Sequence, residues 1–344
     1  MVPAGGLGIA MRAIVVRQFG DVEAAAAGEM PDPLPGPGEA LVDVHATPVN
    51  FVDLLVIGGK YQFLPPRPFV PGKGPAGVVA ALGPGVTGLR VGERVLAMAE
   101  QGGYAERAVA AASSCYGLPA AVSFQQAAAM SLVYDTSWFA LRERARLQAG
   151  ETVLVLGASG GVGFAATQLA KAMGARVLAG ISRPEKEAYV RAAGADAVID
   201  LSRPDLRDSL RAQVYAVTDG KGADVILDPL GGEIFEAAIR ALAWCGRLVV
   251  IGFAAGGIPS LKVNYLLLRN IEVSGLQISD YRKRRPQRVV ECYREVFQLF
   301  LEERLKPGPI TAYPLDQVRD ALVAVRDRTV QGRVVLDVRS SRPT

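Results

Sequence analysis

The sequence predicts an α/β protein in which a doubly wound, six-stranded parallel sheet is inserted into a mostly antiparallel β domain. Three observations predict this fold class. Short apolar runs separated by proline and glycine turns fill residues 12–117, apolar runs alternate with helix-compatible segments over residues 152–276, and strand-like sequence returns near the C-terminus. With 344 residues, the chain is long enough for two domains, each with its own core.

The first domain begins after Ala10 and is predicted to be a compact set of short strands. The runs are RAIVV, EALVDVHA, AGVVAAL, ERVLAM and YAERAVA, and the turns between them include PDPLPGPG, GPGV and QGG. β-Branched residues bounded by such turns are typical of antiparallel strands. Residues 1–10 are apolar and glycine-rich without the basic start of a signal peptide, so they are predicted to be an N-terminal extension.

The second domain is predicted over residues 134–277. Its apolar runs are TVLVLG, RVLAGIS, DAVID, ADVILD, RLVVIG and IEVSGL, with helical segments such as FAATQLAKAMG between them. Continuously apolar strands joined by helices indicate a parallel sheet covered on both faces. Six of them make a Rossmann-type dinucleotide-binding domain.

The remaining segments follow a sheet that is already complete. They comprise an amphipathic helix in RVVECYREVFQLFLEERL, the run ITAYPL, a short helix in DQVRDALVAVRD and a final strand in GRVVLDV. We therefore expect residues 278–344 to return to the first domain, which then consists of residues 11–133 plus 278–344.

Composition excludes several classes of protein. The net charge of +4 is small, and the basic residues are dispersed except in RKRRPQR at 282–288, which argues against a nucleic-acid partner. Cys115, Cys245 and Cys292 lack disulfide-framework or zinc-knuckle spacing, so a reducing, cytoplasmic setting is expected. No apolar run is long enough to cross a membrane.

Two segments compete for the role of a cofactor loop. GKGPAG at 72–77 matches G-x-G-x-x-G, whereas ASGGVG at 158–163 has Ala158 at the first glycine. The pattern binds a pyrophosphate only between a strand and a helix, whose N-terminus supplies free N–H groups. Only VVAALG separates the first segment from Pro84, too short for a helix, so the second segment is predicted to be the loop.

The loop and the end of the next strand predict the cofactor. Gly160 allows close approach of the pyrophosphate, and Gly163 allows the helix to pack closely on the strand. No acidic residue ends the strand at 176–181, and a hydroxyl and two cations suit the 2′-phosphate of NADPH. The alternative is that the cations belong to a solvated helix start balanced by Glu185 and Glu187. The predicted cofactor-binding residues are Ser159, Gly160, Gly161, Val162, Gly163, Ser182, Arg183 and Lys186.

With these segments in order, the chain resembles the zinc-independent, zeta-crystallin-like quinone oxidoreductases of the medium-chain dehydrogenase/reductase superfamily. The resemblance rests on VNFVDLLVIGGKYQ, PFVPGKGPAGVV, AGETVLVLGASGGVG, LDPLGGEIFEAAIRALAWCGRLVVIGFAAG and NYLLLRNIEVSG, and it covers residues 11–338. It implies that the first domain is GroES-like, that the protein is a homodimer, and that hydride passes from NADPH to a quinone.

The resemblance also implies that no metal takes part. Zinc-dependent members of the superfamily carry a cysteine where this chain has Asn50, and His-Glu where it has Lys73 and Gly74. A charged lysine cannot coordinate a divalent cation. The sole histidine, His45, lies in a strand-like run and is expected to be packed rather than to bind metal.

The resemblance assigns the remaining site residues. Asn50, Asp53 and Tyr61 match polar positions near the nicotinamide, where Asn50 donates to the substrate oxygen, Tyr61 orients the substrate or relays a proton, and Asp53 positions the loop. Loop capping by Asn50 and Asp53, and simple packing by Tyr61, are the structural alternatives. Further cofactor contacts are implied for Thr136, Gly252, Phe253, Ala254 and Arg328.

Two other functions stay open at this point. One is reduction of a 2-enoyl substrate, that is an enone, alkenal or enoyl thioester, in which RKRRPQR holds a coenzyme A phosphate; the alternative for that run is a solvated turn. The other is a non-enzymatic cofactor-binding or RNA-binding protein.

Overall fold

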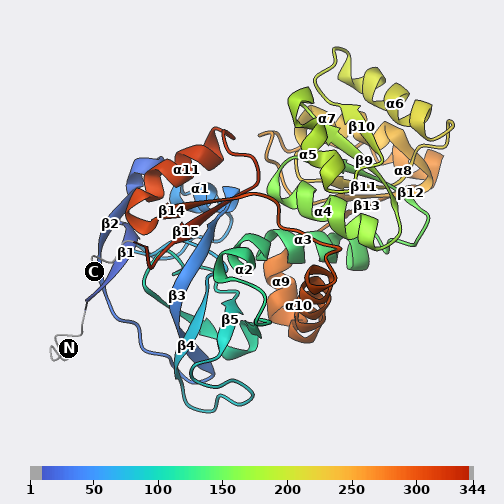
Figure 1. The fold of residues 1–344 in the computed structure, drawn as a ribbon. Helices are drawn as coiled ribbons and strands as arrows, with labels where there is room; N and C mark the ends of the chain where they lie inside the picture. Colours follow the sequence, from blue (N-terminus) through green and yellow to red (C-terminus); the bar gives the residue numbers. More distant parts are fainter. Residues whose placement is uncertain (1–9, 341–344) are drawn as a thin grey trace. The chain divides into compact units, whose positions relative to one another are not determined.

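The computed structural model describes residues 10–340, which form two compact units (Figure 1). The first unit joins the chain up to Leu132 to the chain from Pro307 onward, and the second runs from Val133 to Lys306. The inserted arrangement of the predicted fold class is confirmed. Of the predicted extension, residues 1–9 lie outside the described residues, and Ala10 starts the first strand.

The first unit is built mainly of strands. Its elements are β1 (Ala10–Val16), β2 (Ala25–Pro31), β3 (Glu39–Val49), α1 (Phe51–Ile57), β4 (Ala76–Leu82), β5 (Arg94–Ala97), β6 (Arg107–Ala111), β7 (Cys115–Gly117), α2 (Phe124–Met130), β14 (Ile310–Pro314), α11 (Val318–Arg326) and β15 (Arg333–Asp337).

The long strand β3 organises this unit because it pairs with three neighbours, all antiparallel. These are β4, β6 and the C-terminal strand β15. The main sheet has the order β14-β15-β3-β4-β5-β7, with β6 beside β3, and β1 and β2 form a separate hairpin. Within this sheet of the described chain, only β14 and β15 pair in parallel. A mostly antiparallel β domain is therefore confirmed, and its core lies between the strands and the helices α1 and α11.

The second unit alternates strands and helices. Its elements are α3 (Val133–Phe139), a π-helical turn (Ala140–Arg144), β8 (Thr152–Leu156), α4 (Gly161–Ala172), β9 (Arg176–Ile181), α5 (Glu187–Ala192), β10 (Ala197–Asp200), α6 (Leu206–Val217), β11 (Ala223–Asp228), α7 (Gly232–Ala238), β12 (Leu242–Val250), α8 (Asn264–Arg269), β13 (Glu272–Gly275), α9 (Ile278–Arg284) and α10 (Pro286–Leu301).

Its six strands form one parallel sheet in the order β10-β9-β8-β11-β12-β13. The strand order reverses between β8 and β11, and ligands of such sheets bind at this point, outside the carboxyl ends of the strands. The strands β8, β9 and β11 are almost entirely buried, as expected for a sheet with helices on both faces.

The helices α9 and α10 belong to the second unit, whereas the sequence led us to expect residues 278–344 in the first. The reason is packing: α10 buries Val289, Cys292 and Val296, and its neighbours are α3 and α9. Trp138 on α3 donates to the Glu295 carboxylate over 2.8 Å. An amphipathic helix shows which face is apolar but not which surface that face covers.

None of the helices within residues 10–340 is both long enough and apolar enough to span a membrane.

Candidate active site

The segment after β8 has the geometry of an anion-binding loop. Gly157 turns the chain with a φ of +61°, and Gly160 then caps α4 without any acidic residue in the first turn of that helix. The N–H groups of the first helical turn have no partner inside the helix and point outward along its axis. The predicted residues Ser159 to Gly163 therefore lie where a phosphate fits.

Two glycines of this loop have different surroundings. A Cβ at Gly163 would lie 2.2 Å from the Gly157 carbonyl oxygen, so only glycine lets α4 approach β8 this closely. A Cβ at Gly160 would meet only that same oxygen, at 3.3 Å. Gly163 thus serves internal packing, while Gly160 is much less crowded, with a single backbone oxygen near its Cβ position.

The predicted 2′-phosphate residues follow the end of β9. Ser182 and Arg183 are exposed, Lys186 is half-buried, and Arg183 begins a short 3-10 turn over Pro184–Lys186. Glu187, which we considered as a balancing charge, pairs with Arg191 at 2.7 Å. A hydroxyl and two cations thus stand next to the carboxyl end of β9, where an adenosine ribose is held in sheets of this order.

The other predicted cofactor residues are spread over both units. Thr136 is buried in α3, and the hydroxyl of its neighbour Ser137 lies 2.9 Å from the Val162 carbonyl oxygen. Gly252, Phe253 and Ala254 follow β12, and the Ala254 N–H donates to Pro229 over 3.1 Å. Arg328 is exposed in the first unit just after α11, with a left-handed φ of +56°.

In the first unit, Asn50 and Asp53 are adjacent and buried. Asn50 is the N-cap of α1, and its backbone N–H donates to the Asp53 carboxylate over 2.8 Å. The Tyr104 hydroxyl donates to the same Asp53 oxygen over 2.9 Å. Burial raises the pKa of Asp53 from its ordinary 3.8 to about 6, although the Asn50 N–H favours the anion. Asp53 therefore changes charge close to neutral pH.

Lys73, from the GKGPAG segment, is the nearby buried cation. Its ammonium donates to the Glu100 carboxylate over 2.7 Å and to the Glu100 carbonyl over 2.8 Å. The same ammonium lies 5.6 Å from the centre of the Tyr61 ring, a cation–π distance. Tyr61 is half-buried and meets Phe63 edge to face.

Sequence reasoning missed Tyr104 and Arg333. The Arg333 guanidinium donates to the Asn50 side-chain oxygen over 2.7 Å, and Tyr104 holds Asp53. Neither residue belongs to a local motif, and Arg333 lies 283 positions away from Asn50. Only the pairing register of β15 with β3, which places Val334 opposite Val49, brings them together.

Metal-binding groups are not gathered here. Within residues 10–340 no three His, Cys, Asp or Glu side chains are clustered for a metal ion. His45 stacks on Phe124 with ring centres 4.3 Å apart, and burial lowers its pKa, which fits the expected packed histidine. Burial raises the pKa of the Cys115 thiol to about 12, which disfavours the thiolate that metals bind.

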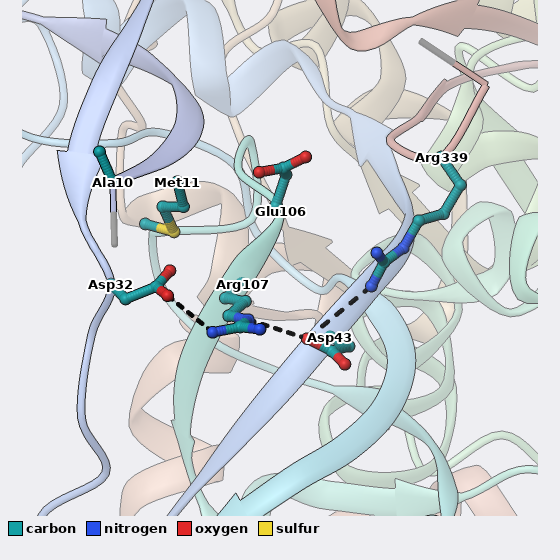
Figure 2. A pocket seen from close by; sticks show the side chains of 7 residues that line it. All are labelled: Ala10, Met11, Asp32, Asp43, Glu106, Arg107 and Arg339. Atoms are coloured by element: carbon teal, nitrogen blue, oxygen red, sulfur yellow. Dashed lines mark hydrogen bonds and ion pairs between the residues drawn. The ribbon is translucent and has the colours of Figure 1, made fainter. Parts of the chain in front are cut away.

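A separate polar pocket lies beside β1 and β6 in the first unit (Figure 2). Its charges compensate one another. Arg107 bridges Asp32 at 2.7 Å and Asp43 at 3.1 Å, and Arg339 lies 3.8 Å from Asp43. Glu106, which also lines the pocket, pairs with Arg12 at 3.0 Å. Because each charged side chain of the lining already has a partner of opposite charge, we do not take this pocket as the candidate active site.

A GroES-like unit interrupted by a parallel nucleotide-binding unit defines the class of medium-chain dehydrogenases and reductases. Two sequence families match the corresponding parts of the chain. The alcohol dehydrogenase GroES-like domain matches residues 36–120, and the zinc-binding dehydrogenase family matches residues 161–296.

Proteins of similar sequence show which family within this class the chain belongs to. A quinone oxidoreductase-like protein 2 homolog of Nematostella vectensis is 38% identical over 307 residues, which cover 88% of this chain and 83% of the relative. The chain therefore belongs to the quinone oxidoreductase family.

Solved structures agree with this membership. A quinone oxidoreductase of Pseudomonas syringae is 30% identical with a TM-score of 0.88, and the Escherichia coli quinone oxidoreductase complexed with NADPH is 28% identical with a TM-score of 0.86. Each comparison covers 95% of this chain and 99% of the other.

Proposed function

We propose that this protein is an NADPH-dependent quinone oxidoreductase that transfers hydride to a quinone without a metal ion. The observation that carries the proposal is the similarity, over nearly the whole chain, to a quinone oxidoreductase complexed with NADPH. The glycine loop before α4 supports it, because its geometry suits a pyrophosphate.

In this proposal the second unit holds the cofactor. The first turn of α4, from Ser159 to Gly163, binds the pyrophosphate, and Ser182, Arg183 and Lys186 bind the 2′-phosphate. Thr136 and the segment from Gly252 to Ala254 contact the nicotinamide half, and Arg328 of the first unit is a further proposed contact. The bound NADPH supplies the hydride.

The first unit supplies the groups for the acceptor. Negative charge develops on a quinone oxygen when hydride arrives, and a fixed hydrogen-bond donor stabilises that charge. Asn50 is the proposed donor because its amide is buried and held by Arg333. Asp53 positions Asn50 through the backbone N–H, and Tyr61 orients the acceptor over the Lys73 side chain.

We also propose a cytoplasmic homodimer. The strand β13 is an unpaired edge of its sheet among the described residues. Large apolar side chains are exposed near it, including Ile258, Val263, Leu267 and Leu268, as expected for a surface that a second copy covers. Light scattering on the purified protein tests the dimer, and Leu267→Glu should shift the mass toward the monomer.

Two of the five cations in the basic run at 282–288 are engaged by carboxylates of the protein. Arg282 is buried and bonded to the Asp135 carboxylate at 2.6 Å, and Arg288 pairs with Glu143 and Glu291. Neither of these two side chains is therefore available to RNA or to a coenzyme A phosphate, whereas Lys283, Arg284 and Arg285 of the same run are exposed.

The test follows nicotinamide absorbance after NADPH is mixed with benzoquinone, an alkenal or crotonyl-coenzyme A in separate reactions. We expect oxidation with the quinone. Oxidation with only the alkenal or the thioester would favour the 2-enoyl reductase, and oxidation with none of them would rule out both. Arg183→Ala should raise the KM for NADPH about tenfold and leave NADH nearly unchanged, because only NADPH carries the 2′-phosphate.

A further inference from the structure

The side-chain amide of Asn50 is held in one orientation. Arg333, whose guanidinium carries only donors, donates from Nη2 to Asn50 Oδ1 over 2.7 Å. With the amide turned over, two donors would face each other at this distance. The oxygen therefore faces Arg333, and Nδ2 with its two hydrogens faces the opposite way.

That second half of the amide is unusual. Asn50 is only 3% exposed, yet among the described residues Nδ2 has no acceptor within hydrogen-bond distance. Leaving a buried donor without an acceptor costs about 1–3 kcal/mol, so such groups are rare in folded proteins and call for an explanation. An acceptor atom on a water or on a ligand satisfies such a donor, and in the proposed function the electron acceptor supplies that atom.

The Arg333 side chain is itself fixed by the fold. It is nearly buried, and its Nε donates to the Ala129 carbonyl oxygen at the end of α2 over 3.1 Å. The register of β15 with β3 sets its place beside the start of α1. From the other side, Asp53 holds the Asn50 backbone N–H at 2.8 Å. The amide is thus held both at its oxygen and at its backbone.

We infer that Arg333 is a positioning residue that fixes the Asn50 amide so that Nδ2 donates to the oxygen of the electron acceptor. The inference rests on the proposed function and adds to it a residue that does not itself touch the acceptor. Because the amide is oriented before the acceptor binds, the amide itself does not have to turn when negative charge builds on the acceptor oxygen. A proton from solvent then completes the hydroquinone.

The kinetic test uses Arg333→Met, Asn50→Leu, the double variant and Arg333→Lys, with benzoquinone as the acceptor. If Arg333 acts through Asn50, Arg333→Met should lower kcat about 10- to 100-fold, and the double variant should be no slower than Asn50→Leu. The KM for NADPH should stay within about twofold of the wild-type value. Arg333→Lys keeps a donor toward Oδ1 and should recover part of the rate.

Arg94→Met is the matched control. Arg94 lies in the same unit and donates only to backbone carbonyls, those of Pro119, Ala120 and Val122. This variant should be less stable than the wild type but should keep its kcat within about twofold. If Arg333→Met behaves in the same way, or if the effects of Arg333→Met and Asn50→Leu multiply, Arg333 has only a structural role and the inference is wrong.

A second readout does not depend on turnover. The chain has three asparagines, Asn50, Asn264 and Asn270, so 15N-asparagine labelling gives three side-chain amide signals, and Asn50→Leu identifies one of them. Benzoquinone should shift this signal in the wild type but not in Arg333→Met. If the wild type does not oxidise NADPH with any acceptor, the proposed function fails. If it does so while the Asn50 signal is unmoved by benzoquinone, the inference fails and the proposed function stands.

Discussion

The segments 72–77 and 158–163 carry nearly the same glycine pattern but use it in opposite ways. In the first, the glycines make room for other parts of the protein. A Cβ at Gly72 would lie 2.2 Å from a ring carbon of Tyr104, and one at Gly77 would lie 2.0 Å from the Asp43 carbonyl oxygen. In the second, Gly163 is crowded in the same way, while a Cβ at Gly160 would have only one neighbour, the Gly157 carbonyl oxygen at 3.3 Å.

The secondary structure on the C-terminal side of each segment accounts for this difference. The first continues into strand β4, whose N–H groups are used by the neighbouring strands, and the second continues into helix α4, whose first N–H groups are unused. A glycine pattern therefore indicates that other atoms, either of the protein or of a ligand, approach the backbone closely. The element after it determines whether that neighbour is the protein or a ligand.

The largest expected effect is common to both segments. Gly77→Val and Gly163→Val each force a side chain against a backbone oxygen, so each should lose at least about 4 kcal/mol of unfolding free energy in its own unit. Hydrogen exchange, resolved by peptide, measures this loss. Faster exchange in β3 and β4 after Gly77→Val, and in β8 and α4 after Gly163→Val, is the expected result; protection unchanged from the wild type would contradict the close contacts.

The next effect concerns Asp53, which Tyr104 holds beside the first segment. Its pKa is raised by burial from 3.8 to about 6, so between these pH values the folded chain keeps a proton that the unfolded chain has released. The unfolding free energy therefore falls as pH rises through this window. Asp53→Asn keeps a side-chain oxygen that can accept from the Asn50 backbone N–H and from the Tyr104 hydroxyl, and it does not ionise.

We expect Asp53→Asn to be more stable than the wild type by about 3 kcal/mol at pH 7.5 and by little at pH 3.5. The difference in unfolding free energy between the variant and the wild type is measured by denaturant titration, with hydrogen exchange of β3 as the readout for the first unit. Asp327→Asn is the control of opposite sign, because the Arg326 hydrogen bond lowers the pKa of Asp327. A difference for Asp53→Asn that does not change with pH would contradict the raised pKa.

A smaller effect separates the two segments most directly. Gly160→Ala adds a methyl group that would lie 3.3 Å from the Gly157 carbonyl oxygen, a contact that a shift of a few tenths of an ångström relieves, and Gly160 has an ordinary extended backbone. The melting temperature should change little, but NADPH should bind about 30-fold more weakly, since the methyl group occupies the approach of the pyrophosphate. Calorimetric titration measures the affinity. NADPH binding as tight as in the wild type would mean that the second segment is not the cofactor loop.

The smallest expected effect is that of metal removal, which should not change the rate of quinone reduction. The resemblance places Lys73 and Gly74 where zinc-dependent members of the superfamily carry His and Glu, so we expect that exhaustive treatment with EDTA leaves the rate of quinone reduction unchanged. Elemental analysis of the purified protein should find less than about one zinc per ten chains. A stoichiometric metal that restores lost activity would overturn the metal-free proposal.

The sequence predicted the second unit better than the first. The strand at 176–181 has the predicted bounds, and the strand at 152–156 matches the predicted run TVLVLG up to its final glycine, because apolar runs between glycine turns are signals contained within a few residues. The helix after the predicted cofactor loop begins at Gly161 rather than at Phe164, since glycine lowers helix propensity but is accepted in a first turn held by packing.

The polar groups of the first unit were only partly predictable. Asn50 and Asp53 were found through the family resemblance, but Tyr104 and Arg333, which hold them, were not. Their contacts depend on strand register and on a turn that places Tyr104 against Gly72. A register shifted by one residue would turn Arg333 to the other face of the sheet, and no local pattern in GRVVLDV fixes that register.

The bond between Arg333 and Asn50 has a consequence for how the protein is made. The two residues are 283 positions apart, and β15 is the last strand of the described chain. During synthesis the second unit is complete before β15 leaves the ribosome. A chain that stops short of β15 therefore retains the glycine loop and its adjoining helix but lacks Arg333, so the bond that fixes the Asn50 amide is among the last to form.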